Sequence, residues 1–160
     1  MADQNADPEE TTRVIAALRA AGVEATARVL PESTRTAAQA AKVLGCDIGA
    51  IANSLVFIAD DAPLLVLTSG AHRVDPDRLA ARLGRTSIRI ATPTEVENAT
   101  GQKVGGVSPV GHPAPVETVV DGELAGYERI WAAAGTANAV FDTTFDELVT
   151  ATGARVVEVA

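Results

Sequence analysis

Cysteine and aromatic residues are scarce in this sequence, and each shortage excludes a class of protein. Cys46 is the only cysteine among 160 residues, so an internal disulfide and a zinc site built from paired cysteines are both excluded. Phenylalanine, tryptophan and tyrosine together make up 3% of the residues. That proportion argues against a surface that binds single-stranded nucleic acid by stacking its bases on aromatic rings.

Positive charge is also in short supply. The sequence has 13 basic and 21 acidic residues, which gives a formal net charge of -8 at pH 7. A protein that binds nucleic acid by neutralising many phosphates needs clustered lysine and arginine. We therefore expect no DNA partner, and any contact with RNA should be local.

Long apolar segments and the common catalytic motifs are missing. No segment stays apolar long enough to span a bilayer, and residues 1–7 lack the apolar region of a signal peptide. The sequence therefore predicts a cytoplasmic protein without membrane association. A P-loop, a His-Glu-x-x-His pair, a Gly-x-Ser-x-Gly elbow and a dinucleotide-binding glycine motif are absent as well, so we expect neither a metal nor a cofactor.

The composition that remains is typical of one packed domain. Hydrophobic residues make up 47% of the chain and charged residues 21%, a balance that favours a globular core over disorder. We expect a flexible tail over residues 1–7 and a single domain over residues 8–160. Helix-start signals, among them the capping boxes that begin at Thr92 and Thr144, separate the predicted elements.

The order of these elements predicts an α/β domain. Helical patterns begin near residues 8, 36, 75, 92 and 144, and four of them end at glycines 22, 45, 84 and 153. Strand patterns cover residues 26–30, 54–58, 64–68, 87–90, 116–120, 129–133, 139–141 and 155–159. Strands and helices do not alternate one for one. We therefore expect a curled, barrel-like mixed sheet with surrounding helices rather than a doubly wound parallel sheet.

A glycine-rich loop over residues 104–111 is the strongest candidate for a binding site. Gly105 and Gly106 can adopt positive φ angles and let a ligand approach the backbone, while Pro109 holds Ser108 in an extended conformation. Such a loop can present peptide groups to a developing oxyanion or to an amino acid. A tight turn between two strands explains the same residues. His112, just after the loop, is either a proton-transfer group or a residue that stabilises the turn.

The loop and its flanking segments resemble the YbaK and prolyl-tRNA-synthetase-associated editing domains. Residues 105–109 are similar to the GxxxP-containing pocket loop of that family. Other segments follow in the family's order, namely residues 36–41, 51–57, 74–80, 91–101 and 148–154. The resemblance implies a YbaK-like fold and a trans-editing aminoacyl-tRNA deacylase, with the aminoacyl-tRNA acceptor end and an aminoacyl-tRNA synthetase as partners.

The same resemblance implies the residues of the site. We expect a catalytic role for Asn53, Gly105 and Gly106, and substrate contacts from Ser54, Val107, Ser108, Pro109, Gly135 and His112. In the family a lysine stands just before the Ser or Thr of the central strand, where this chain has Asn53. An amide donates hydrogen bonds but carries no net charge. The alternative function is therefore a non-catalytic module that binds an amino acid, an aminoacyl-tRNA end or a synthetase. A structural adaptor is a third, weaker reading, since no heptad repeat is present.

Overall fold

The computed structural model describes residues 9–31 and 36–160. Its α-helices are α1 (Glu9–Ala20), α2 (Ala37–Leu44), α3 (Pro76–Leu83), α4 (Pro93–Thr100) and α5 (Phe145–Thr152). Its strands are β1 (Arg28–Val29), β2 (Ile51–Ala59), β3 (Ala62–Ser69), β4 (Ile88–Ile90), β5 (Glu117–Asp121), β6 (Ile130–Ala133), β7 (Ala139–Thr143) and β8 (Arg155–Val157). Two short 3-10 turns, η1 (Ile48–Ala50) and η2 (Gly122–Gly126), complete the described elements.

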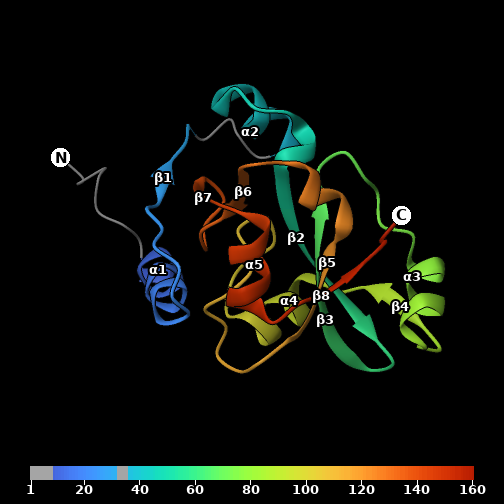
Figure 1. The fold of residues 1–160 in the computed structure, drawn as a ribbon. Helices are drawn as coiled ribbons and strands as arrows, with labels where there is room; N and C mark the ends of the chain where they lie inside the picture. The colour runs from blue at the N-terminus through green and yellow to red at the C-terminus, as the bar shows by residue number, and fades with distance from the viewer. Residues whose placement is uncertain (1–8, 32–35) are drawn as a thin grey trace.

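The strands form one mixed sheet, which confirms the predicted α/β class. Its order is β1-β7-β6-β2-β3-β5-β8, and β4 pairs with β2 off this path. Parallel ladders join β2 to β6, β3 to β5 and β5 to β8, while the other ladders are antiparallel. No ladder joins β1 to β8 in the described residues, so the sheet is open rather than a closed barrel. The helices are distributed around this sheet (Figure 1).

The central hairpin of β2 and β3 has a sequence-encoded turn. Ala59 pairs with Ala62, which leaves Asp60 and Asp61 as a two-residue connection. Both residues have positive φ angles, 48° and 72°. Aspartate tolerates this conformation better than most residues, and such turns match the twist of a hairpin. The Asp60 carboxylate also accepts hydrogen bonds from the backbone N–H groups of Thr86 and Ser87, which ties the turn to the start of β4.

The predicted helix boundaries agree with the structure wherever it describes them. Thr36, Thr92 and Thr144 each form a complete capping box, and Asp75 caps α3 ahead of Pro76. Four of the helices end at a glycine with a positive φ angle. The predicted tail and the cap at residues 7–8 lie outside the described residues.

Some strand boundaries differ from those expected. β2 extends on both sides of the predicted residues 54–58, because it pairs with β3 along its whole length. β1 is only two residues long, although the Leu30 N–H still donates to the Asn138 carbonyl next to β7. β8 ends two residues early at Val157.

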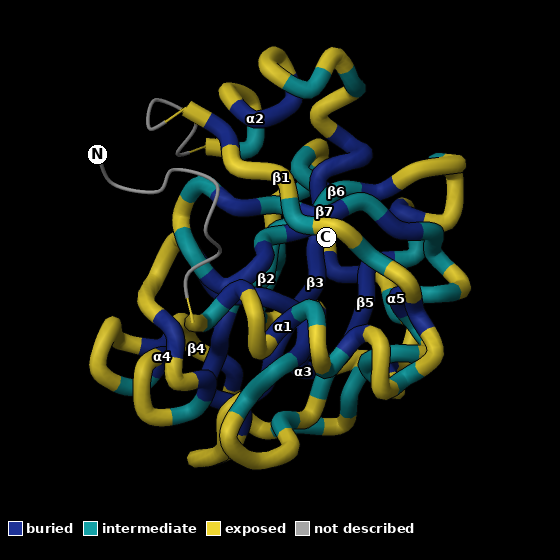
Figure 2. Tube along the Cα trace, turned by 90° about the vertical axis from the view of Figure 1, so that its left-hand side faces the viewer, coloured by how far each residue is buried: buried dark blue, intermediate teal, exposed yellow. Residues whose placement is uncertain are grey.

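Burial is concentrated in the centre of the sheet. Figure 2 shows buried backbone along β2, β3 and β5, with exposed residues in the surrounding loops. The side chains of Leu64, Leu65, Val66 and Leu67 on β3 are all fully buried, so both faces of this strand are covered. One face belongs to a core with α1, α4 and α5, and the other packs on α3. Within the described chain, no helix has the length and apolar character to cross a membrane.

Candidate functional site

The sheet is split along one edge of β2. The other edge of this strand pairs with β3 from Ala52 to Ala59. On the split edge, β6 pairs only with Ile51 and Ala52, and β4 pairs only with residues 57–59. Within residues 9–31 and 36–160, residues 53–56 therefore have no ladder partner on this side. The gap between β6 and β4 is the structural basis of the site.

The backbone N–H and C=O groups of Ser54 point into this gap. Ile51 accepts a hydrogen bond from Gly70 N, which shows that the odd-numbered residues of β2 turn their peptide groups toward β3. Val56 instead accepts a bond from Ala91 N, on the split edge. Ser54 shares the orientation of Val56, but no strand of the described residues lies opposite it. Its N–H and C=O are therefore available to a ligand in the gap.

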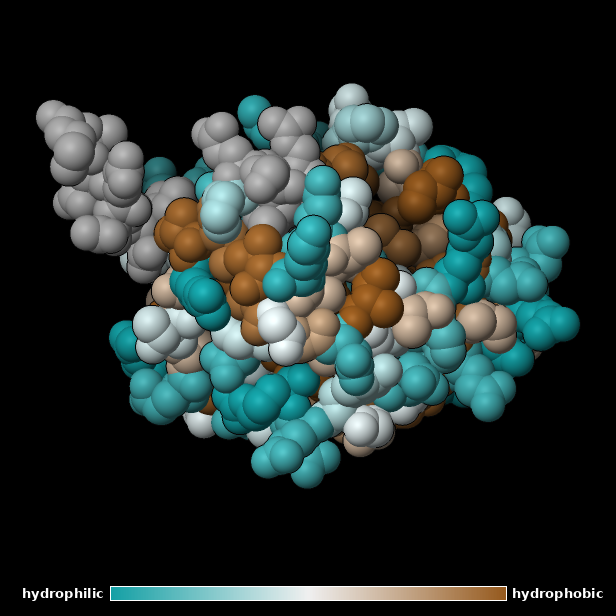
Figure 3. All heavy atoms as spheres, turned by 90° about the horizontal axis from the view of Figure 1, so that it is seen from above, coloured by the Kyte–Doolittle hydropathy of each residue, from teal (hydrophilic) through white to brown (hydrophobic). Residues whose placement is uncertain are grey.

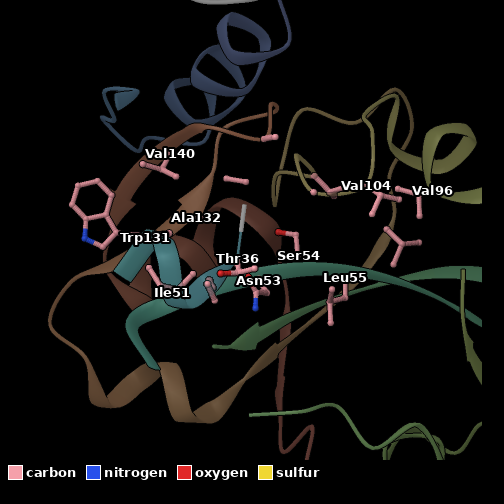
Figure 4. Close-up of a pocket in the computed structure, with 18 of the residues that line it drawn as sticks. Thr36, Ile51, Asn53, Ser54, Leu55, Val96, Val104, Trp131, Ala132 and Val140 are labelled. Carbon is pink, nitrogen blue, oxygen red and sulfur yellow. The ribbon is translucent and has the colours of Figure 1, made fainter. Parts of the chain in front are cut away.

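A cavity of about 360 Å³ occupies the split. Its polar side chains are Thr36, Asn53 and Ser54. The rest of its wall is apolar or glycine, from Leu30, Ala37, Ala40, Ile51, Ala52, Leu55, Val56, Ile90, Ala91, Val96, Val104, Gly105, Val107, Trp131, Ala132, Ala133, Ala137 and Val140. Figure 4 shows these side chains converging from β2, β6, β7, α2 and the glycine loop. A mostly apolar cavity of this size with a few polar groups is typical of a site for a small molecule.

Asn53 and Ser54 project from opposite faces of β2, as adjacent residues of a strand do (Figure 4). Asn53 lies on the same face as Ile51, whose neighbour across the parallel ladder is Trp131. Its amide makes no hydrogen bond to another described side chain or backbone group. Ser54 lies on the face of Ala52 and Val56, and its buried hydroxyl has no hydrogen-bond partner among the described residues. In the described part of the chain, neither polar side chain thus has a hydrogen-bond partner.

The glycine loop brings two of its residues to the cavity. Gly105 has a φ angle of 91°, is exposed, and lies in the cavity wall together with the buried Val107. Gly106 is buried behind them. A Cβ at Gly106 would lie 2.8 Å from the backbone of Thr136, so its lack of a side chain lets the loop pack on the β6–β7 turn. The structure therefore brings Asn53, Ser54, Gly105 and Val107 to one cavity.

The other predicted site residues lie outside the cavity wall. The Ser108 N–H donates to Gln102 Oε1 at 2.8 Å, and Gln102 Nε2 donates to Ser108 Oγ at 2.9 Å. Ser108 Oγ also donates to the carbonyl of Val110. These contacts hold the loop in shape, and Pro109 beside them is buried. Sequence reasoning missed Gln102, because a glutamine between Gly101 and a lysine gives no sign of burial.

His112 and Gly135 also have structural surroundings. His112 Nε2 lies 2.8 Å from the Ser108 carbonyl, and burial lowers the pKa of the imidazole below its usual value. The neutral ring therefore donates Nε2–H to that carbonyl. Gly135, with a φ angle of 98°, lies against the backbone of Glu10 on α1. Roles for these two residues in binding stay predictions.

The second histidine has a partner that the sequence did not reveal. His72 Nδ1 lies 2.9 Å from Asp121 Oδ2, whose side chain is buried. Asp121 also accepts the N–H groups of Ser69 and Glu123. This cluster joins the ends of β3 and β5 and lies outside the cavity wall. Within residues 9–31 and 36–160, no group of three or more His, Cys, Asp or Glu side chains is placed to hold a metal ion.

The cavity has apolar side chains at its rim. Ile90 and Val104 belong to its wall and are 60% and 61% exposed, so they form part of its rim. Figure 3 shows hydrophobic side chains gathered in patches among hydrophilic ones on the face that carries α2. Exposed apolar side chains around a cavity are typical of a binding surface.

Comparison with known proteins identifies the family of this chain. The sequence model of one family, described as an aminoacyl-tRNA editing domain, matches residues 31–151. A crystal structure of a proposed trans-editing enzyme for prolyl-tRNA synthetase superposes with a TM-score of 0.90 and 40% identity, over 96% of this chain and 98% of that one.

Two curated relatives extend the comparison. YwhH of Bacillus subtilis, an uncharacterised protein, is 31% identical over 117 residues, which cover 72% of this chain and 74% of YwhH. The proline–tRNA ligase of Nitratidesulfovibrio vulgaris (strain DP4) is 32% identical over 102 residues. That match covers 64% of this chain but only 18% of the ligase. The chain thus corresponds to a small part of the ligase.

Proposed function

Because the chain belongs to the aminoacyl-tRNA editing domain family, we propose that it hydrolyses the ester bond of mischarged aminoacyl-tRNA. The observation that carries this proposal is the cavity in the split of the sheet, whose wall includes Asn53, Ser54 and Gly105. An ester of an amino acid fits such a site, since it combines a small side chain with a carbonyl that needs hydrogen-bond donors.

The reaction requires little from the protein beyond positioning. Water attacks the ester carbonyl, the bond between the carbonyl carbon and the ribose oxygen breaks, and that oxygen takes a proton, which releases the amino acid and the tRNA. The Ser54 N–H or the Asn53 amide donates to the carbonyl oxygen as negative charge develops there. The terminal ribose hydroxyl, held near the reacting bond, assists the proton transfer. The apolar rim at Ile90 and Val104 packs against the terminal base.

The neutral Asn53 distinguishes this chain from the editing domains it resembles. An ammonium in that position binds a phosphate or an ester oxygen through a charge-assisted hydrogen bond, which is stronger than a bond from a neutral amide. We therefore expect the rate of hydrolysis to depend more on how the ester and the attacking water are aligned than on a positive charge at position 53. The same substitution supports the second candidate function, a module that binds an aminoacyl-tRNA end without cleaving it.

We further propose that the protein acts in trans on tRNA. The support is that this chain covers 98% of a proposed trans-editing enzyme, whereas it covers only 18% of a ligase that contains a similar segment. Similarity to proline–tRNA ligases favours tRNA(Pro) as the substrate and the corresponding synthetase as a partner.

The test is deacylation of one tRNA(Pro) transcript charged in turn with alanine, serine, cysteine, threonine, valine and proline. We expect the wild-type protein to release at least one non-cognate amino acid faster than the uncatalysed rate and to spare prolyl-tRNA. Asn53→Lys should raise the rate about tenfold, because a charge-assisted bond is worth roughly 1.5 to 3 kcal/mol. Asn53→Ala should lower it.

Asn98→Lys is the matched control, since Asn98 is exposed on α4 and lies outside the wall of this cavity. An equal gain from this variant would assign the effect to net charge and not to the site. If neither the wild type nor Asn53→Lys releases any amino acid, the non-catalytic module becomes the better description. Binding of uncleaved aminoacyl-tRNA would then support that module directly.

A further inference from the structure

The hydroxyl of Ser54 is unusual among the buried serine hydroxyls of this fold. Ser69 Oγ donates to the Gly49 carbonyl at 2.7 Å, and Ser108 Oγ donates to the Val110 carbonyl. Ser54 Oγ is buried and has no hydrogen-bond partner in the described chain, although the residue lies in the cavity wall. Leaving a buried hydroxyl unpaired costs stability unless another molecule supplies the missing bond. Because Ser54 belongs to the cavity wall, a turn of its side chain about χ1 brings the hydroxyl to a ligand that can supply the bond.

The surroundings of this hydroxyl are apolar. On the same face of β2, Ser54 is flanked by Ala52 and Val56, and the facing walls come from Ala91, Val107 and Ala132. In Figure 4 the Ser54 side chain points into the space between Ala132 and Val104, away from the direction of Asn53. Since no hydrogen bond holds the hydroxyl in place, a rotation about χ1 redirects it at little cost. The cavity wall next to Ser54 is therefore apolar apart from this hydroxyl.

We infer that the Ser54 hydroxyl forms a hydrogen bond with the side chain of the esterified amino acid. The site therefore selects an amino acid whose side chain carries a hydroxyl group, threonine or serine. This inference rests on the proposed function, because it assigns the substrate class of the same site. In the complex, the Ser54 hydroxyl and the substrate hydroxyl form a hydrogen bond with each other, while the methyl group of threonine packs on Val56 and Val107. An aliphatic side chain of the same shape leaves the Ser54 hydroxyl buried and unpaired.

Threonine and valine esters test this inference because the two side chains have nearly the same shape. One tRNA(Pro) transcript is charged with either amino acid, and kcat/KM is measured for both. We expect the wild-type protein to favour the threonyl ester about tenfold, the usual effect of one buried hydrogen bond. Ser54→Ala should abolish this preference, mainly by slowing release of threonine. The substitution removes an unpartnered group, so the fold should be retained.

Ser69→Ala is the matched control. It removes a buried hydroxyl that has partners and lies outside the cavity wall, so it should lower stability and leave the threonine-to-valine ratio unchanged. The inference is overturned if Ser54→Ala slows both esters equally, because the hydroxyl then contacts the ester and not the side chain. A wild-type ratio near one overturns it as well.

A binding measurement separates failure of this inference from failure of the proposed hydrolysis. The probes are adenosines that carry threonine or valine through a non-hydrolysable 3′-amide, and the measurement is calorimetry. If no ester is cleaved but the threonyl probe binds about tenfold tighter and Ser54→Ala removes the difference, the hydrolase proposal fails and the Ser54 inference stands. Equal binding of the two probes overturns the inference, whatever the outcome of the hydrolysis assay.

Discussion

Two adjacent glycines in the loop beside the cavity face different constraints. Gly105 has a φ angle of 91° and open space around the position of a Cβ, whereas a Cβ at Gly106 would lie within 3.0 Å of backbone atoms of Thr136 and Ala137. The first glycine is required for its conformation, and the second for close packing. Backbone atoms cannot swing aside as the end of a side chain does, so the second constraint is the stronger one.

Alanine substitutions should separate these two roles. Gly105→Ala should cost about 1 to 2 kcal/mol in the free energy of unfolding and slow deacylation, because the strained loop shifts at the cavity wall. Gly106→Ala should cost more, since the loop must move away from the β6–β7 turn. Urea denaturation of both variants measures the difference. A Gly106→Ala protein as stable as the wild type would contradict the packing role.

His112 gives the fold a dependence on pH at the residue scale. Burial lowers the pKa of His112 below its unfolded value of 6.5, so the folded protein binds this proton less readily than the unfolded chain does. Above pH 6.5 the imidazole is neutral in both states, so its protonation does not affect the free energy of unfolding. As the pH falls below that value, the unfolded chain binds the proton more readily and the free energy of unfolding decreases.

We expect the melting temperature of the wild type to fall between about pH 7.5 and about pH 5.5 by more than that of His112→Gln. Glutamine does not titrate but can still donate to the Ser108 carbonyl. Parallel melting curves over this interval test the difference between the two proteins. Identical slopes would show that protonation of His112 has no effect on stability.

At the scale of elements, the start of α4 links the sheet to the cavity. Thr92 caps the helix, and Glu95 accepts the Thr92 N–H and pairs with Arg89 on β4. The hydrogen bond from Arg89, together with that from Thr92, lowers the pKa of Glu95 to about 2. The helix carries Val96 into the cavity wall, and β4 carries Ile90. This cap therefore fixes two parts of the site at once.

Thr92→Ala should lower the free energy of unfolding by about 1 kcal/mol, the usual effect of removing an N-cap.

Because the folded pKa of Glu95 is depressed, the stabilisation that its carboxylate provides is present above pH 4.5 and is lost as the pH falls toward 2. Glu95→Gln should therefore be less stable than the wild type at neutral pH and approach it in acid. Urea denaturation at several pH values tests both variants. A constant difference would contradict the ion-pair assignment.

At the scale of the whole molecule, negative charge limits how the protein can hold RNA. Most arginines of the described chain form ion pairs with acidic residues. The basic side chains without such a pair among described residues are Arg28, Lys42, Arg73, Lys103 and Arg155. With a net charge of -8, the protein should contact one or two phosphates at the acceptor end rather than a long stretch of backbone.

This distribution of charge predicts weak salt dependence. Raising the salt from about 50 to about 200 mM should lower the affinity for aminoacyl-tRNA by less than about tenfold, because one or two neutralised phosphates release few counterions. Asn53→Lys should increase the slope of log affinity against log salt concentration by the amount expected for about one additional phosphate contact. Titrations at several salt concentrations measure both slopes. A loss of a hundredfold or more for the wild type would reveal a broad basic surface that the charge pattern does not suggest.

Local signals in the sequence determined the elements of this fold. The capping boxes at Thr92 and Thr144, the glycines that end helices and the aspartates between β2 and β3 each act through contacts within a few residues. For that reason the helix starts and the central hairpin could be predicted without knowledge of the rest of the molecule. The short strings that resemble the editing domains likewise located the glycine loop and Asn53.

Only the tertiary structure decided which residues meet at the site. The split between β6 and β4 arises because two strands far apart in the sequence pair with different parts of one edge of β2. No local pattern encodes that pairing, so the position of the Ser54 peptide groups at the split and the burial of its hydroxyl could not be predicted. The burial of Gln102 against Ser108 and of Asp121 against His72 depends on long-range packing in the same way. Sequence patterns specify local conformation, whereas the cavity is specified by contacts between distant segments.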